Sequence, residues 1–215
     1  MKKKWILLLG ICLIGFEASS QKFALKSNLL YDATTTINLG VEFALADQWT
    51  LDISGNYNPW TFSQTTKNTS GVILSEHDAK IKHWLVQPEV RWWTCEKFHG
   101  HFFGLHGHTG EFNVGGLTFL PDGWADGYTD KNGTHHPDGL QHKRFQGWLL
   151  GAGLSYGYHW ILSNRFSLEF TVGGGYTYLN YDKFDRADNA PKEAERYMHY
   201  VGPTKVGITA VFMLK

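Results

Sequence analysis

The residues of this 215-residue chain that could do chemistry together are charged side chains within segments that alternate apolar and polar residues. If those segments are strands, the charged residues share one face, because successive side chains of a strand point to opposite faces. Such a set could form an ion-pair network, an ion pathway or a catalytic carboxylate pair. Its near balance of charge favours the network, with Arg91 shared by Glu89 on its own strand and by Asp52 or Glu42 across the barrel. The set is Lys26, Glu42, Asp52, Glu89, Arg91, Glu169 and Lys205.

Histidines form a second candidate. Four of them fall within residues 99–108, and the spacing of His106 and His108 puts both on the polar face of one segment. Zinc needs three or four ligands with supporting hydrogen bonds, so we expect these two histidines to hydrogen-bond inside the fold instead. The run His135-His136-Pro137-Asp138 could hold a surface cation on equally slight grounds.

Two further motifs have ordinary explanations. The run Asp130-Lys131-Asn132-Gly133 begins like a calcium loop but lacks the downstream glutamate, and Asx-Gly turns account for it. Cys95 lies between two aromatic runs, where we expect an unpaired cysteine in a turn. The sequence therefore predicts no catalytic residue, no metal ligand and no cofactor.

Period-two alternation defines the elements that must position these residues. It runs through residues 23–31, 37–45, 49–57, 83–92, 103–110, 147–158, 166–176 and 205–214. The apolar faces carry no Asp, Glu, Lys or Arg, although 19% of the chain is charged. A charge at the lipid midplane costs about 2–4 kcal/mol, which would explain the exclusion. The pattern predicts an all-β fold: an eight-stranded antiparallel up-and-down transmembrane β-barrel whose lumen is filled by side chains.

The connections between these segments alternate in length. Short links at 46–48, 94–100 and 161–164 alternate with long ones at 58–82, 111–145 and 182–200. The fourth connection on the long-loop side, 32–36, is short. Outer-membrane barrels have short periplasmic turns and long outer loops, so both termini should be periplasmic. Pro88 lies within a segment and cannot donate a hydrogen bond, so we expect a β-bulge there.

Aromatic residues near the segment ends predict the girdles that mark the two membrane interfaces. They are Trp49, Tyr57, Trp60, Trp84, Trp92, Trp93, Trp160 and Tyr178.

The N-terminus predicts export. Residues 2–4 are lysines, residues 5–16 are apolar, and Glu17-Ala18-Ser19-Ser20 supplies small residues for a signal peptidase. We therefore expect a signal peptide over residues 1–20 and an outer-membrane domain over residues 21–215.

Three stretches resemble one family. They are KSNLLYDATTTINLGVEFALADQWTLDISGNYNPWTF, KHWLVQPEVRWWTCEKFHGHFFGLHG and the ending VGPTKVGITAVFMLK. They are similar to a domain-of-unknown-function family of small outer-membrane β-barrels from Bacteroidetes-type bacteria, often encoded beside fimbrial genes. The resemblance implies an eight-stranded barrel in the outer membrane, a surface-assembly setting and no assigned chemistry.

These observations leave three classes of function. Lysine plus arginine equals aspartate plus glutamate at 20 each, which argues against a nucleic-acid partner. We expect a monomeric, non-enzymatic protein of the cell outer membrane, in contact with lipid and with a structural or surface-interaction role, linked to fimbria or adhesin assembly. An outer-membrane enzyme acting on lipid or peptide is the first alternative, although no convincing His with Ser or Asp is found. A small-ligand-binding barrel is the second, although its faces would have the opposite polarity.

Overall fold

The structure is a computed structural model, and it describes residues 23–67, 73–117, 128–129, 132–136, 139–140, 142–185 and 190–214. The expected signal peptide over residues 1–20 lies outside these residues. The described chain is almost entirely β-strand.

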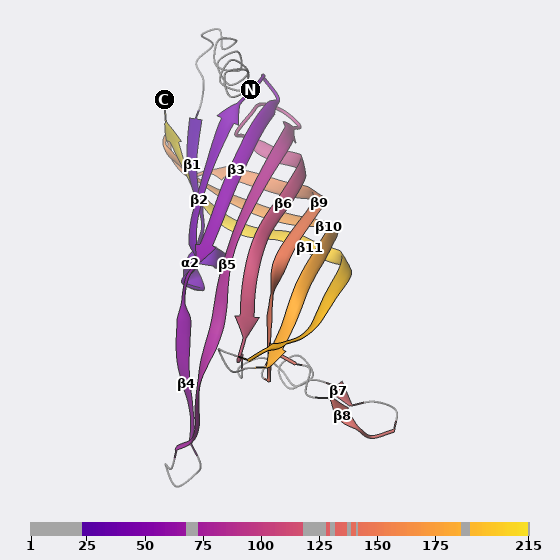
Figure 1. Ribbon diagram of the computed structural model, residues 1–215. Coiled ribbons are helices and arrows are strands. Elements are labelled where there is room, and N and C mark those ends of the chain that lie inside the picture. The colour runs from indigo at the N-terminus through magenta and orange to yellow at the C-terminus, as the bar shows by residue number, and fades with distance from the viewer. Residues whose placement is uncertain are drawn as a thin grey trace, which may run out of the picture.

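Consecutive antiparallel strands close into a ring (Figure 1). The first and last of them pair with each other, from Phe23 opposite Leu214 to Asn28 opposite Thr209. The expected all-β, antiparallel fold with a closing last strand is therefore confirmed. The strands of the ring are β1 (Phe23–Asn28), β2 (Ile37–Ala44), β3 (Trp49–Asn58), β5 (Ile73–Trp93), β6 (Gly100–Gly115), β9 (Lys143–Ile161), β10 (Phe166–Asp185) and β11 (Lys192–Leu214).

Other elements lie at the end of the ring away from Phe23 and Leu214. Strand β4 (Thr61–Lys67) pairs with the first part of β5, and this hairpin extends beyond the ring (Figure 1). The short strands β7 (Tyr128–Thr129) and β8 (His135–His136) form a separate pair. No helix among the described residues is long and apolar enough to span a membrane.

The first expected strand was too long. Strand β1 ends at Asn28, whose side chain accepts a hydrogen bond from the backbone N–H of Leu30 at 3.1 Å. Asn28 therefore caps the short helix α2 (Leu29–Ala33), because a side-chain oxygen can satisfy an unpaired N–H of the first turn. Leu29 and Tyr31, which continue the apolar alternation, belong to this helix.

Two of the expected long loops are shorter than predicted, because the strands beside them are longer. Residues 61–67 and 73–82 are strand, and β10 and β11 stay paired out to Phe184 opposite Lys192. In the outer parts of β10 and β11 both faces carry polar residues. The apolar alternation therefore fades while the backbone pairing continues.

The expected bulge at Pro88 is absent. The pairs Val86–Thr109 and Glu89–His106 keep one register across this proline, and Pro88 lies opposite Ile53 without a shift. Instead, the bulge lies in β11 at Thr204, since Gly173 pairs with Lys205 and Gly174 with Pro203.

An apolar cluster fills the ring at the end where Phe23 and Leu214 meet. It consists of Ala24, Trp93, Phe98, Phe102 and Val211, all buried. Trp93 was expected in an outward girdle, but it points inward, and its ring centroid lies 4.9 Å from that of Phe102. Phe98 adopts a left-handed backbone (φ 59°) in the turn between β5 and β6, which places its ring against Trp93.

Candidate functional site

The interior of the ring is polar above this apolar cluster. Side chains at alternate positions of each strand point inward, and there the buried residues are mostly charged or hydroxyl-bearing. The seven charged residues proposed from the sequence are all inward. Six of them are at most 5% exposed, and the side chain of Lys205 is 12% exposed.

Arg91 lies at the centre of these charges. Its Nε donates to Glu89 Oε1 at 3.0 Å, and its second terminal nitrogen donates to Asp52 Oδ2 at 2.8 Å. The first terminal nitrogen lies 3.0 Å from both Glu42 Oε2 and Glu169 Oε2. The structure thus adds Glu169 to the partners expected from the sequence. A planar guanidinium with five donors is suited to such sharing.

The two lysines complete the pairing. Lys26 Nζ donates to Glu42 Oε2 at 2.7 Å and to Glu169 Oε2 at 2.8 Å. Lys205 Nζ donates to Glu89 and lies 3.8 Å from Asp52. We call the seven residues the charge network. They come from β1, β2, β3, β5, β10 and β11, so the network ties together six of the eight strands of the ring.

Hydroxyl groups that the sequence argument did not assign add hydrogen bonds to three of the carboxylates. Thr50 Oγ1 donates to Glu42 at 2.5 Å, Ser155 Oγ to Glu89 at 2.9 Å and Thr171 Oγ1 to Glu169 at 3.2 Å. Their inward alternation was visible in the sequence. Their specific partners depend on how the strands pair around the ring.

The charge network leaves little free space. The cavity beside Lys26, Asp52 and Arg91 has a volume of about 30 Å³, which is room for only a few water molecules. Each carboxylate has a cationic partner and is almost fully buried. The network is therefore arranged to hold strands together.

The two inward histidines lie next along β6. His106 Nε2 shares a hydrogen bond with Thr204 Oγ1 at 2.9 Å, and His108 Nε2 shares one with Thr177 Oγ1 at 2.7 Å. Glycines on β9 face them. A Cβ atom at Gly151 or Gly153 would collide with the imidazole of His108 or His106. The glycines of β9 thus leave space inside the ring for the imidazole rings of β6.

A third inward histidine was missed. His159 of β9 is buried, its Nδ1 lies 3.6 Å from Glu169 Oε2, and its ring packs edge-on against Trp93. It follows Ser155 and Gly157 at alternate positions, but the sequence argument ended that segment at Tyr158.

The outer rim of the ring carries two rows of side chains on its outward face. Paired residues of neighbouring strands lie side by side, and positions two apart on a strand share a face. The aromatic row, nearer the middle of the ring, is Tyr57, Trp84, Glu111, Trp148 and Asn180. The polar row beyond it is Lys82, Asn113, Gln146, Asp182 and Glu195.

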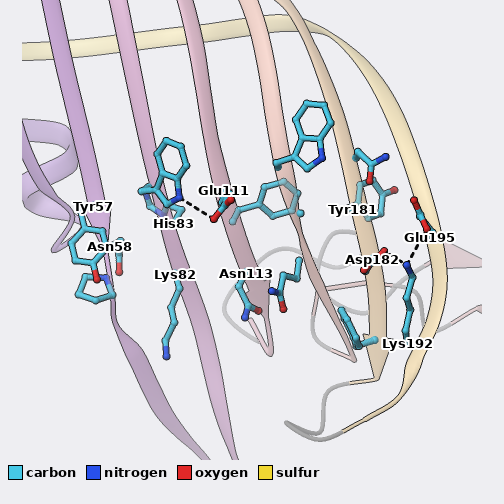
Figure 2. Close-up of a pocket in the computed structure, with 18 residues that line it drawn as sticks. Tyr57, Asn58, Lys82, His83, Glu111, Asn113, Tyr181, Asp182, Lys192 and Glu195 are labelled. Atoms are coloured by element: carbon cyan, nitrogen blue, oxygen red, sulfur yellow. Dashed lines mark hydrogen bonds and ion pairs between the residues drawn. The ribbon is translucent and has the colours of Figure 1, made fainter. Parts of the chain in front are cut away.

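A hollow of about 750 Å³ opens at this rim, and its lining holds residues of both rows together with inward residues such as Asn58, His83 and Tyr181 (Figure 2). In this view Tyr57 lies at one side and Glu195 at the other, with Glu111 and Asn113 between them. Trp84 Nε1 donates to Glu111 Oε2 at 3.1 Å, which fixes an indole against a carboxylate. The sequence argument assigned Tyr57 and Trp84 to a girdle but did not find the hollow, because the rows appear only once the register is known.

The remaining predicted positions are placed only in part. Cys95 is an exposed free cysteine in the turn between β5 and β6, as expected. Among the described residues, no three His, Cys, Asp or Glu side chains are grouped to hold a metal ion. Asp130, Lys131 and the side chain of His135 lie outside the described residues.

Comparison with known families gives one assignment. No curated protein matches the chain. A family model described as "Protein of unknown function (DUF3575)" matches residues 6–214, and so this chain belongs to that family.

Proposed function

We propose that this chain is an outer-membrane β-barrel with a structural or surface-interaction role and no enzymatic activity. The observation that carries the proposal is the chemistry of the outward face. From the turns at the Phe23 end up to the aromatic row, the described ring strands carry no Asp, Glu, Lys or Arg at outward positions. A lipid-facing surface requires this exclusion, whereas a water-facing one does not.

The exposed apolar side chains support the same proposal. Leu39, Leu105, Leu154 and Val172 are about 60% exposed or more, and they lie on four different strands of the ring. A soluble protein rarely leaves so continuous an apolar surface uncovered. Lipid tails would cover it on every side of the ring.

The two ends of the ring support an orientation. The links 45–48, 94–99 and 162–165 are short and lie at the Phe23 end, while the long excursions lie at the other. In bacterial barrels the short turns face the periplasm. We therefore propose that the aromatic and polar rows lie at the outer interface, where surface partners of the fimbrial or adhesin class would meet the protein.

Cell fractionation tests the proposed location. We expect the protein in outer-membrane fractions, released by detergent but not by high salt, with gel migration that changes on heating. Recovery as a soluble periplasmic protein would refute the barrel proposal.

Tag accessibility tests the orientation. An epitope inserted beside Gly133 should be labelled on intact cells, whereas one beside Asp47 should be labelled only after permeabilisation. Both positions are exposed in the structure, so the second insertion is a matched control. The reverse result would invert the proposed topology.

A further inference from the structure

We propose that the mouth of the ring, its open end away from Phe23, binds a fatty acid, with the acyl chain against a row of inward apolar side chains and the carboxylate on Arg196. The inference goes beyond the proposed function and rests on it only for the lipid surroundings that would supply the ligand. The residues concerned lie on β5, β6, β9, β10 and β11, which continue past β1, β2 and α2 (Figure 1).

The mouth is open because the ring is lower on one side. In the described chain, β1 pairs with β11 only as far as Asn28 opposite Thr209, while β11 continues beside β10 to Lys192. The hollow of about 750 Å³ at this end includes inward residues such as Phe112 and Tyr181 in its lining. A ligand can therefore enter the ring from this end.

Side chains that cross the ring form a floor beneath the mouth. His108 Nε2 shares a hydrogen bond with Thr177 Oγ1 at 2.7 Å, and Gln87 Nε2 donates to the backbone oxygen of Thr204 at 3.4 Å. Each of these bonds joins two strands that are not neighbours in the ring. A ligand that enters from the open end would lie above them, apart from the charge network.

The first row of inward positions above the floor is apolar. Strand pairing places Leu149 opposite Leu179, and Leu179 opposite Met198. On the other side of Leu149, only Gly110 separates it from Leu85. These positions lie two residues further along each strand than the floor, so they share its inward face.

The protein leaves this apolar row partly uncovered. Its three leucines are half-buried, and Met198 is 43% exposed although it points inward. From β5 to β11 the row crosses four strand spacings of about 4.8 Å, which gives a path of about 19 Å. That path is long enough for the acyl chain of a fatty acid.

The next row toward the open end supplies a cation. Arg196 pairs with Tyr181, which puts it on the inward face, and it is exposed. Within the described chain, Arg196 makes no ion pair or side-chain hydrogen bond, and the hydroxyl of Tyr181 makes no hydrogen bond. A guanidinium binds a carboxylate through two parallel hydrogen bonds. The carboxylate would thus meet Arg196 while the chain follows the row from Met198, two residues along the same strand.

The other inward charges at this end leave Arg196 unmatched. Lys143 Nζ pairs with Glu193 at 2.5 Å and lies 3.9 Å from Asp185, while Lys183 Nζ lies 3.7 Å from Glu193. With Arg196, three cations therefore face two carboxylates among these described residues. One net positive charge favours a singly charged anion over a neutral or cationic ligand.

The carboxylates on the outward side of the hollow are already engaged. Asp182 and Glu195 lie 2.6 Å and 3.0 Å from Lys192 Nζ. Glu111 accepts a hydrogen bond from Trp84 Nε1 at 3.1 Å. They would therefore repel an inward carboxylate less than unpaired acids would.

A water-filled mouth explains the open space but not the leucines. Inward positions of outer-membrane barrels are ordinarily polar, and here both the floor and the charge network follow that rule. An apolar row above them, with a cation beside it, is the arrangement that a ligand with one apolar tail and one anionic head would use.

Photo-cross-linking to the full chain in lipid vesicles tests the proposal. The protein would be refolded into vesicles of phosphatidylcholine, which carries no net charge, and irradiated with palmitate that bears a photoreactive group near its methyl end. Mass spectrometry of the digested protein locates the cross-links. The competitors are unlabelled palmitate, hexadecanol and acetate, which supply the whole ligand, the tail alone and the head alone.

We expect cross-links near Leu149, Leu179 and Met198 that palmitate competes away. Hexadecanol should compete at least tenfold more weakly, and acetate should not compete. Cross-links on the outward face, near Leu105 and Leu154, should not be competed, because bulk lipid surrounds these residues. The outward cross-links are thus an internal control.

Variants locate the head group. Arg196→Gln should weaken the competed cross-linking at least tenfold, while Arg196→Lys, which keeps the charge, should retain part of it. Arg165→Gln is the matched control, because Arg165 is also exposed and without an ion pair in the described chain, but lies at the Phe23 end. Unchanged heat-dependent gel migration would show that each variant is folded.

Three results would overturn the proposal: palmitate competes for no cross-link, hexadecanol competes as well as palmitate, or Arg196→Gln and Arg165→Gln behave alike. Such a result for a protein that still fractionates with the outer membrane would leave the proposed function intact. Recovery of the protein in soluble form would refute the proposed function, whereas competed cross-linking of that soluble protein would uphold the fatty-acid site.

Discussion

The charge network and the two outward rows both contain polar side chains from neighbouring strands. They differ in burial and in the free space beside them. Inside the ring, Arg91 alone contacts four carboxylates, and the adjoining cavity is about 30 Å³. At the rim, a hollow of about 750 Å³ opens, and the charged pair of Lys192 with Asp182 lies beside it. In the interior every carboxylate of the charge network has a buried or nearly buried cationic partner, whereas the rim pairs are exposed.

This difference separates groups that support the fold from groups that are available to a ligand. Buried charges are tolerated when they are paired and hydrogen-bonded, so a fully paired set is best explained by stability. Polar groups that line an open hollow can be reached by other molecules. Charge content alone would have pointed to the interior as the functional site.

The sharpest test of the interior removes its centre. Arg91→Ala would leave Glu42, Asp52, Glu89 and Glu169 with only two lysines, and we expect it to lower the free energy of unfolding by about 3–5 kcal/mol. Urea unfolding in lipid vesicles measures the change. Replacing Arg91 and Glu89 together by leucine should recover part of the loss, since an apolar pair can substitute for an ionic one.

An unchanged urea midpoint for Arg91→Ala would show that the charge network does not hold the ring together. Loss of a specific activity without loss of stability would favour the enzyme alternative.

A charge on the outward face tests what surrounds the ring. Leu154 is 68% exposed at an outward position of β9. If lipid covers it, Leu154→Arg should cost about 2–4 kcal/mol in vesicles. Gln146→Arg, on the same strand in the polar row, should cost about 0–1 kcal/mol, because the penalty falls toward the interface. Equal costs for the two would contradict a membrane-spanning β9.

Glycine substitutions compare the crowded interior with the open exterior at smaller cost. A Cβ atom at Gly104 would collide with Glu89 Oε1 and Ser155 Oγ, so Gly104→Ala should lower the free energy of unfolding by about 1–3 kcal/mol. Gly55 has no atom within 4 Å of its ideal Cβ position. Gly55→Ala should leave the urea midpoint unchanged or slightly raised. The opposite ranking would mean that Gly104 does not face the network.

The smallest effect concerns the exposed ion pairs of the rim. The hydrogen bond to Asp182, with that to Glu195, raises the pKa of Lys192 above its usual 10.5. Any stabilisation from this shift is fully present below pH 10.5 and is lost as the pH rises through the raised pKa. NMR titration should show the pKa of Lys192 falling back toward 10.5 in Asp182→Asn. Glu96→Gln, at the opposite end, should leave it unchanged.

The ring of strands and the members of the charge network could be predicted from the sequence, because both follow from strict alternation of apolar and polar residues. Glu42, Glu89 and Arg91 could be assigned to the inward face by parity alone. The hydroxyl donors and Glu169 as a partner of Arg91 could not be paired in advance, because partners across the ring depend on strand register.

Alternation also failed wherever polarity did not differ between the two faces. The outer parts of β10 and β11 have polar residues on both sides, so their strand character was hidden. Trp93 was misassigned because an aromatic residue at a strand end can belong to an interface or to a core. The hollow was missed for both reasons together.

The pairing of β1 with β11 has a consequence for how the molecule forms. Phe23 meets Leu214, so the contact that seals the ring joins the two ends of the described chain. The chain loses the conformational entropy of closing this long loop before the hydrogen bonds between β1 and β11 can compensate for it. Until then β1 and β11 each present an unpaired edge, which is open to aggregation. Closure therefore requires the final strand, and a chain that lacks residues 209–215 would lose every pair between β1 and β11.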